Sequence, residues 1–418
     1  MSVPALSLAA LALAIVVSCV TRLNVGVLSL ALAWIVGVYF AHIPVNEVMG
    51  GFPSQLFLTL AGVTLLFTMA QSNGTLEKLA HRAVRICRGN RGMIPIMFFF
   101  LAITLASMGP GNIATAALVA PMAMATASRA GIPLFLMAIM VGNGANAGSL
   151  SPFAPTGIIV NNLMARIGLT GLEAQAFLYN ALAHALAGFA GYFLFGGWKL
   201  FARKGTVEAV DQDAATLGGP FEARHWITLA AIALLLVGVI FFKVNVGLGA
   251  FLISVLLVLL RAANDVEAIR KMPWGVIVMV SGVTVLIALL EKTNGLDLFV
   301  SLLARLATRN SVTAVVAFVT GIISVYSSTS GVVLPAFLPM VPGLAARLGG
   351  ADIVAIAMSM NIGAHLVDVS PLSTIGALCI ASAPPGEDTR KLFLKLMAWG
   401  LSMSVAGPVI CYLFFGRR

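Results

Sequence analysis

Apolar segments long enough to span a membrane alternate with short polar stretches along almost the whole chain. A membrane-spanning helix needs about 20 mainly apolar residues. Segments of this kind lie at 3–20, 24–41, 53–72, 174–200, 226–243, 246–261, 274–291 and 391–415. The pattern predicts an all-α polytopic membrane protein.

Two further apolar segments are interrupted near their middle. Segment 94–130 is interrupted at 108–112 by Met-Gly-Pro-Gly-Asn, and segment 311–347 at 326–331 by Tyr-Ser-Ser-Thr-Ser-Gly. Gly and Pro so placed turn the chain, and irregular backbone at membrane depth has to be buried in protein. We therefore predict a re-entrant helical hairpin in each segment, with its tip at the interruption.

Two other spans are predicted to be broken helices, and two stretches are predicted to lie at the membrane surface. The broken spans are 132–165, interrupted at 142–150, and 353–382, interrupted at 361–369. The surface stretches are 76–91, in which arginines recur every three residues, and 296–309. Basic side chains on one side of an amphipathic helix are typical of a helix lying in the interface.

The same order of segments occurs twice. The offset between matching positions stays between 219 and 221, as in Ser151 to Ser370, Gly62 to Gly282 and Asn24 to Asn245. We predict a first repeat at 1–201, a cytoplasmic linker at 202–224 and a second repeat at 225–418. Each half has five crossings and one hairpin that returns to its own side, so the second repeat is predicted to be inverted relative to the first.

Composition and charge support a membrane protein. The chain of 418 residues is 60% hydrophobic and 10% charged, whereas soluble domains carry about 25% charged residues. The net charge of +10 comes from basic residues in short loops, as membrane orientation requires, and this argues against a nucleic-acid partner. The sequence has no P-loop, HExxH motif or nucleophile elbow, so we expect neither an enzyme nor an organic cofactor.

The four interruptions carry the candidate site. Inverted symmetry brings them to the middle of the membrane, where half-helix N-termini attract anions and unwound backbone with Ser, Thr and Asn oxygens coordinates small cations. The candidate substrate-binding residues are Gly111, Asn112, Thr115, Ser151, Pro152, Ser328, Thr329, Ser330, Ser370 and Pro371. The candidate cation ligands are Ser107, Asn112, Asn143, Asn146, Ser327, Thr329, Asn361 and Asp368. A plainer reading is that these polar groups only cap broken backbone.

Asp368 and His365 are the ionisable candidates. An ionisable residue within a membrane segment is costly and is by default functional. Asp368 is interpreted as a cation ligand or a proton carrier, and His365, three positions earlier, shares either role. The structural alternative for Asp368 is a carboxylate that orients the loop through backbone N–H groups.

The interruptions resemble those of a known family. Gly109-Pro110-Gly111-Asn112-Ile113-Ala114-Thr115, and Gly142-Asn143-Gly144-Ala145-Asn146 followed by Ser151-Pro152, are similar to motifs of the ion-transporter superfamily. The closer resemblance is to the MatC-type malonate and dicarboxylate carriers, which are related to the divalent-anion/sodium symporters. The first tip departs from the Ser-Asn-Thr signature of those symporters and keeps only Asn112 of it.

The resemblance implies a homodimer in the bacterial inner (cytoplasmic) membrane. It also implies a scaffold of helices 3–72 and 226–291, a mobile transport domain of hairpins and broken helices, an elevator mechanism and coupling to Na⁺. We expect a secondary active transporter for a small dicarboxylate of the malonate, succinate or malate type. One alternative is a proton-coupled anion carrier that uses Asp368 and His365. The other is an anion channel, but two hairpins on opposite sides favour alternating access over a channel.

Overall fold

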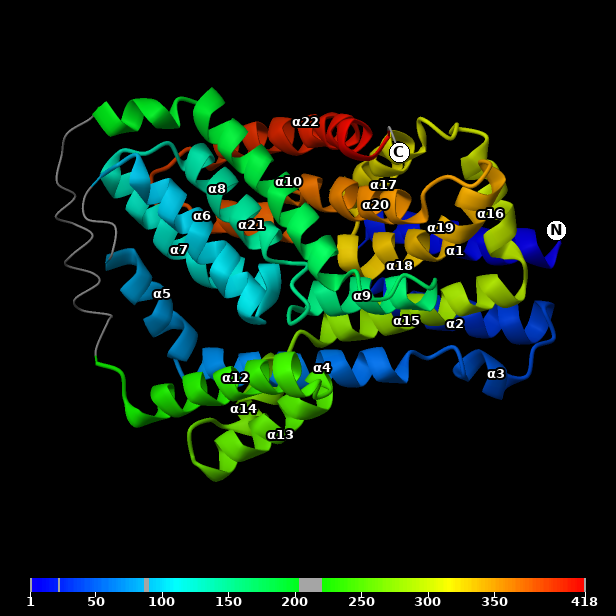
Figure 1. Cartoon of the computed structure of the whole chain (residues 1–418), viewed down its shortest axis with the longest axis horizontal. Helices are drawn as coiled ribbons and strands as arrows, with labels where there is room; N and C mark the ends of the chain where they lie inside the picture. Colours follow the sequence, from blue (N-terminus) through cyan, green and yellow to red (C-terminus); the bar gives the residue numbers. More distant parts are fainter. Residues whose placement is uncertain (1, 22, 86–89, 203–219, 417–418) are drawn as a thin grey trace.

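The computed structural model describes residues 2–21, 23–85, 90–202 and 220–416. All the helices and turns in these ranges are drawn in Figure 1, and the regular structure that they contain is helical throughout. The predicted all-α class is therefore confirmed. Most of the predicted linker 202–224 and residues 86–89 of the predicted surface stretch lie outside the described residues.

The helices of the first part of the chain follow its apolar pattern. They are α1 (Val3–Val20), α2 (Val25–Trp34), the π-helix η1 (Ile35–Phe40), α3 (Val45–Met49), α4 (Ser54–Ser72), α5 (Thr75–Arg85), α6 (Met93–Met108), α7 (Gly111–Ala130), α8 (Leu134–Ala147), α9 (Pro155–Arg166), α10 (Glu173–Leu194) and the 3-10 helix η2 (Gly197–Ala202). The short helix α3 is not apparent in the hydropathy pattern.

The helices of the later part follow a similar order. They are α12 (Ala223–Phe242), α13 (Val246–Leu259), α14 (Asp265–Lys271), α15 (Trp274–Lys292), α16 (Gly295–Ala304), α17 (Val312–Tyr326), the π-helix η3 (Thr329–Val333), α18 (Leu334–Phe337), η4 (Leu338–Met340), α19 (Val341–Arg347), α20 (Ile353–Leu366), η5 (Val367–Val369), α21 (Thr374–Ala381) and α22 (Thr389–Phe415). Figure 1 shows α6, α7, α8 and α10 gathered beside α17, α20 and α22, while α13 and α14 lie below α4.

Both helical breaks lie later in the chain than the sequence predicts. The sequence predicts interruptions at 142–150 and 361–369, but α8 remains helical to Ala147 and α20 to Leu366. The glycines in these stretches permit close packing instead: a Cβ at Gly144 would lie 2.5 Å from the carbonyl oxygen of Phe99. Small residues let membrane helices approach closely. The glycines therefore mark helix contacts, and the chain leaves the helix only after them.

The tip of the first hairpin needs glycine at two positions. Gly109 has a φ of 139° and Gly111 a φ of 77°, and such values are accessible to glycine at little cost. A Cβ at Gly109 would also collide with the ring of Phe67 on α4. The turn between α6 and α7 is thus fixed both by backbone conformation and by its neighbour.

Glycines also join α2 to α15 and α4 to α13 at very short range. A Cβ at Gly62 on α4 would collide with the carbonyl oxygen of Gly247 on α13, and a Cβ at Gly282 on α15 would collide with that of Gly26 on α2. Gly62 and Gly282 occupy matching positions in the two halves, as do Gly26 and Gly247. The absence of side chains there brings each pair of backbones into direct contact.

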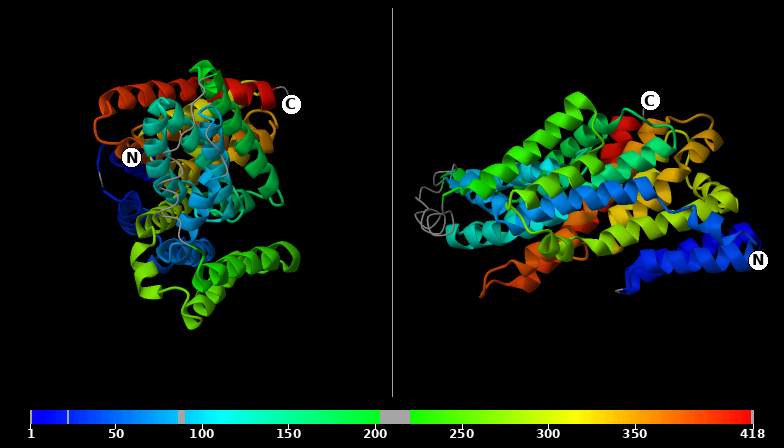
Figure 2. Two further views of the ribbon diagram at one scale, coloured as in Figure 1. Left: turned by 90° about the vertical axis from the view of Figure 1, so that its left-hand side faces the viewer. Right: turned by 90° about the horizontal axis from the view of Figure 1, so that it is seen from below.

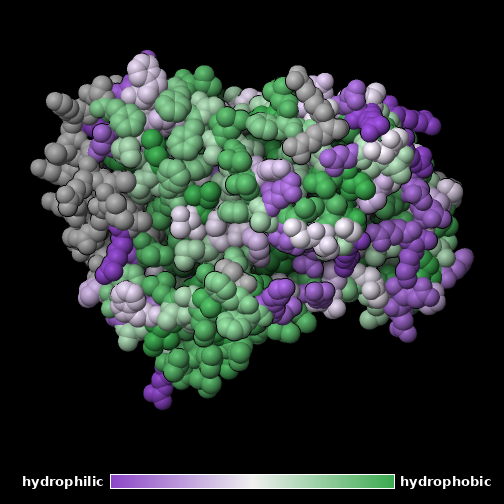
Figure 3. Space-filling model, viewed as in Figure 1, coloured by the Kyte–Doolittle hydropathy of each residue, from purple (hydrophilic) through white to green (hydrophobic). Residues whose placement is uncertain are grey.

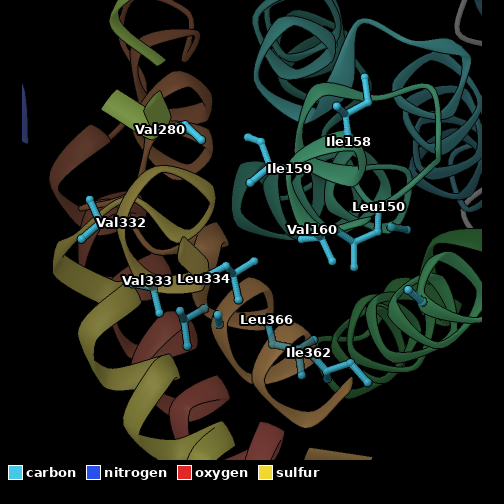
Figure 4. Packing of buried hydrophobic residues seen from close by; sticks show 14 of the residues in the cluster. Leu150, Ile158, Ile159, Val160, Val280, Val332, Val333, Leu334, Ile362 and Leu366 are labelled. Atoms are coloured by element: carbon cyan, nitrogen blue, oxygen red, sulfur yellow. The ribbon is translucent and has the colours of Figure 1, made fainter. Parts of the chain in front are cut away.

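Apolar side chains fill the region where the two parts of the chain meet. Figure 4 shows Ile159 and Val160 of α9 beside Leu334 of α18, with Ile362 and Leu366 of α20 close by. All five are buried. This packing holds the second hairpin against the broken helix of the first part and places both tips near the middle of the molecule.

Seven helical segments of the described residues are long and apolar enough to cross a membrane. They are Ser54–Ser72, Gly111–Ala130, Glu173–Leu194, Trp274–Lys292, Thr329–Arg347, Ile353–Ala381 and Thr389–Phe415. Figure 3 shows apolar side chains over the part of the surface where α12 and α13 lie, and Figure 2 shows those helices at one side of the molecule. The chain is a multi-pass membrane protein.

The glycine contacts predict a stability effect. Gly62→Ala and Gly282→Ala should each lower the free energy of unfolding by about 1–3 kcal/mol, because the added methyl group has to displace backbone. Gly238→Ala is the matched control, since its Cβ would meet nothing closer than a Val244 methyl carbon at 3.6 Å. Thermal unfolding of the detergent-solubilised protein measures the effect. Equal midpoints for all three variants would contradict it.

Candidate functional site

A cavity of ≈ 280 Å³ lies between the two hairpin tips and the break that follows α20. The tips supply Asn112 and Ile113 of α7 and the run from Tyr326 to Ser330. The other residues that line it are Thr21, Leu23, Val25, Met279, His365, Asp368, Leu372, Ser373, Thr374 and Ile375. Segments that are far apart in the sequence therefore form one polar chamber.

Three helix N-termini converge on this cavity. They are the first turn of α7 at Asn112, the start of the continuous helical stretch Thr329–Arg347, and the start of α21 at Thr374. A helix N-terminus presents unpaired N–H groups and the positive end of the helix dipole. Such ends attract anions.

Asp368 is buried beside the second hairpin tip. Thr329 Oγ1 donates to Asp368 Oδ1 at 2.7 Å, and the Thr329 and Ser324 hydroxyls are also hydrogen-bonded. A threonine hydroxyl has one proton, so the proton of the Ser324 bond belongs to Ser324 when Thr329 donates to the carboxylate. The Ser373 hydroxyl donates to the backbone carbonyl of Asp368. Hydroxyl groups thus hold Asp368 in place from two sides.

His365 lies on the same wall of the cavity. Its Nδ1 is 2.8 Å from the backbone carbonyl oxygen of Asn361. A carbonyl oxygen only accepts, so Nδ1 carries a proton and Nε2 is the nitrogen that remains to bind or release one. The Nε2 atom of His365 can therefore hydrogen-bond to a ligand or exchange a proton while Nδ1 keeps its hydrogen bond to the Asn361 carbonyl oxygen.

Hydroxyl groups dominate the polar surface of the cavity. The hydroxyl-bearing residues are Thr21, Tyr326, Ser327, Ser328, Thr329, Ser330, Ser373 and Thr374. Among the lining residues that the structure describes there is no Lys or Arg; Arg22 lies outside the described residues. A bound anion would meet helix ends, hydroxyls and an amide, together with one carboxyl group.

The amides of the first part form a network behind the cavity. Asn112 Nδ2 donates to Asn146 Oδ1 at 2.9 Å, and Asn180 Nδ2 donates to the Asn146 carbonyl oxygen at 2.8 Å. Asn143 Oδ1 is 3.0 Å from Nδ1 of His184. These contacts connect the first hairpin tip through α8 to α10. They fix the position of Asn112, the one side-chain amide among the described residues that line the cavity.

The structure separates the predicted site residues into two groups. Those that line the cavity are Asn112, Ser327, Ser328, Thr329, Ser330, His365 and Asp368. Those that do not are Ser107, Gly111, Thr115, Asn143, Asn146, Ser151, Pro152, Asn361, Ser370 and Pro371. Ser151 illustrates the second group, since its hydroxyl donates to the carbonyl oxygen of Ser107 at 2.6 Å and so stabilises the broken backbone.

Sequence reasoning missed several residues of the site. Ser373 and Thr374 line the cavity. They follow the second Ser-Pro pair, and the matching positions of the first half hold Ala154 and Pro155. This difference between the halves was a signal that the sequence offered. Asn180 was also visible as an amide in an apolar span. Thr21 and Met279 carry no such signal, because nothing local distinguishes them from other residues near helix ends and in helix cores.

The donor set suits a small hard cation better than a transition metal. No group of three or more His, Cys, Asp or Glu side chains that could hold a metal ion occurs in the part of the chain that the structure describes. Carboxylate, carbonyl and hydroxyl oxygens are the groups that hard cations prefer. Around Asp368 these oxygens come from Thr329, Ser324 and the carbonyl of Ala364, which is 3.3 Å from Thr329 Oγ1.

Comparison with known proteins identifies the first part of the chain. Residues 1–149 match the family described as "Dicarboxylate carrier protein MatC N-terminus". This range includes the first hairpin, Asn112, Asn143 and Asn146, and it ends before Ser151. No curated protein sequence matches the chain significantly.

The family match confirms the resemblance found in the motifs of the first hairpin and of α8. The family is one of carrier proteins, so the assignment is to transport rather than to catalysis. Residues 1–149 therefore match the N-terminal domain of the dicarboxylate carrier MatC family.

Proposed function

We propose that the protein is a secondary active transporter that carries a small dicarboxylate, of the malonate, succinate or malate type, together with Na⁺. The observation that carries the proposal is the cavity itself: three helix N-termini and eight hydroxyl-bearing residues converge on it, with no Lys or Arg among the described lining residues. Such a surface can hold carboxylates without binding them too tightly to release.

Coupling to a cation follows from the charges in the cavity. A dicarboxylate that enters it comes close to Asp368, and two like charges in a region of low dielectric repel strongly. A cation held by Asp368 and Thr329 removes that repulsion, so cation and substrate bind together. Na⁺ fits the oxygen donors around Asp368, and transporters of this architecture place coupling ions at broken helices.

Alternating access is proposed to occur by an elevator movement. The cavity is lined on one side by Val25 and Met279 of the closely packed α2–α15 pair and by Leu23 just before α2, and on the other side by the two tips and the break after α20. A boundary of this kind lets the tips and broken helices move as one body against a fixed scaffold. The matched glycine contacts support an inverted repeat, and we include the homodimer and the bacterial cytoplasmic membrane in the proposal.

Proton coupling is the second candidate, because Asp368 and His365 both face the cavity. Protonation of Asp368 would remove the same repulsion that a bound cation removes. In this scheme the carboxyl group takes up a proton with the substrate and releases it on the other side, and Nε2 of His365 is the nearby exchanging group. An anion channel is disfavoured, since two hairpins entering from opposite sides favour alternating access over a continuous pore.

Uptake of labelled malonate and succinate into proteoliposomes tests the function. We expect accumulation with an inward Na⁺ gradient and little with an inward proton gradient. Proton-driven accumulation would replace the Na⁺ proposal with the second candidate. Absence of uptake under either gradient, by protein that elutes as a folded species, would rule out these dicarboxylates as substrates.

Thr329 is predicted to be essential for transport because its hydroxyl supplies the side-chain hydrogen bond to Asp368. Thr329→Val should lower uptake at least about ten-fold, since loss of a hydrogen bond to a charged group costs roughly 1.5–3 kcal/mol, and Thr329→Ser should retain most of it. Thr104→Val is the matched control, because the Thr104 hydroxyl is exposed and bonds only to the carbonyl of Phe100 in its own helix. Equal uptake by the Val and Ser variants at position 329 would argue against this role.

Asp368 is predicted to couple the cation to the substrate. Asp368→Asn keeps the size of the side chain and removes its charge, so the variant should still bind substrate but lose its dependence on the cation gradient. Substrate binding to purified protein and gradient-driven accumulation in proteoliposomes should be measured on the same preparation. Wild-type accumulation by this variant would show that coupling does not depend on Asp368.

A further inference from the structure

A long apolar groove lies between α10 and α22, away from the cavity. The two helices run in opposite directions: the ring of Phe195, just after α10, is 6.0 Å from that of Trp399, and Tyr179 near the start of α10 is 5.4 Å from Phe415. One section of the groove has a volume of ≈ 610 Å³ and the other ≈ 480 Å³. Both sections are lined by Leu186 and Ile410, so they adjoin.

A cationic side chain stands at one end of this groove. Lys395 lines it together with Phe135, and its Nζ is 5.7 Å from the centre of the Phe135 ring. Lys391 lies one helical turn earlier on the same face of α22 and is exposed. Neither lysine forms an ion pair with any residue that the structure describes. The groove therefore offers unneutralised positive charge at its mouth.

Trp399 adds a polar donor one turn further along. It lines the groove, and its indole N–H is buried without an acceptor among the described residues. The opposite edge of the ring packs against Gly191 of α10, where a Cβ would lie 2.8 Å from the ring. An unpaired donor in apolar surroundings is costly, so an acceptor in the groove would stabilise a rotated ring whose N–H faces it.

The order of these groups matches that of a phospholipid. Cationic side chains come first, then a hydrogen-bond donor, then the apolar side chains of Met403, Ala406 and Ile410. From Trp399 to Ile410 the helix rises about 16 Å, at ~1.5 Å per residue. That length is about half of the ~30 Å hydrocarbon core, which is the depth of one leaflet.

We propose that this groove binds one anionic phospholipid of the surrounding membrane. The phosphate lies at Lys395 and Lys391, an ester carbonyl approaches Trp399, and an acyl chain follows α22 towards Ile410. The charge at the mouth favours an anionic headgroup over a zwitterionic one, while the apolar floor accepts any acyl chain of suitable length. Because α10 connects through Asn180 to the network behind the cavity, the lipid would rest on an element that supports the site.

Native mass spectrometry of the full-length protein tests the proposal without measuring transport. The purified chain is exchanged into micelles that contain equal amounts of phosphatidylglycerol and phosphatidylcholine with identical acyl chains. We expect one molecule of phosphatidylglycerol to be retained in preference to phosphatidylcholine. Lys395→Gln should weaken that retention about five-fold, the equivalent of about 1 kcal/mol per basic side chain at a lipid surface, whereas Lys271→Gln on α14 should not change it.

Groove-filling variants separate a specific site from a general lipid coat. Ala190 and Ala398 line the groove and are exposed, so Ala190→Phe or Ala398→Phe should displace the lipid without disturbing the core, and Ala230→Phe on the exposed face of α12 is the control. Equal retention of both lipids, or unchanged retention by Lys395→Gln and the Phe variants, would overturn the proposal. The proposal would also be overturned if the chain forms a dimer and Ala190→Phe converts that dimer to a monomer. A second copy of the chain would then occupy the groove.

Discussion

The structure depends on one constraint, namely that broken backbone inside a membrane has to be enclosed by protein. Both hairpin tips and the breaks after α8 and α20 meet this constraint by packing against one another, as Ile159, Val160 and Leu334 show. Enclosure is also what makes the site: the peptide groups freed at the breaks are buried, polar and close together. Apolar packing between the two parts of the chain thus fixes where a ligand can meet helix N-termini.

The polar groups at the breaks serve two purposes. Those of the first part mainly stabilise the fold, and those of the second part mainly form the wall of the cavity. In the first part the side-chain oxygen of Asn146 accepts from Asn112, and Asn180 Nδ2 donates to the backbone carbonyl of Asn146, so these amides stabilise the fold around Asn112. In the second part the hydroxyls of Thr329 and Ser373 hold Asp368 at the cavity wall. The site is consequently asymmetric although the helix order is repeated. In the proposed symport, this asymmetry assigns cation binding mainly to the second part.

The match of residues 1–149 to the N-terminus of the dicarboxylate carrier MatC and the chemistry of the cavity agree on the proposed class of substrate. A cavity with many hydroxyls, several helix ends and no described Lys or Arg attracts an anion weakly and releases it readily, as a carrier must. A cavity built around an arginine clamp would bind a dicarboxylate more tightly and would release it slowly. In the proposed symport, the carboxyl group of Asp368 repels the anion alone, and a coupled cation removes this repulsion.

The sequence by itself determined most of the helices, the positions of the hairpin tips and the concentration of polar residues at the interruptions. These features are local: apolar length specifies spans, and Gly109 and Gly111 specify a turn through their backbone conformations. Tertiary structure decided which polar residues reach the cavity. Thr329 faces it and Thr115 does not, although both are predicted site residues. The rotation of each helix about its axis determines this, and the rotation is set by contacts such as Gly144 with Phe99, between residues far apart in the chain. The same contacts explain why the glycines of α8 continue a helix that the sequence alone predicted to break.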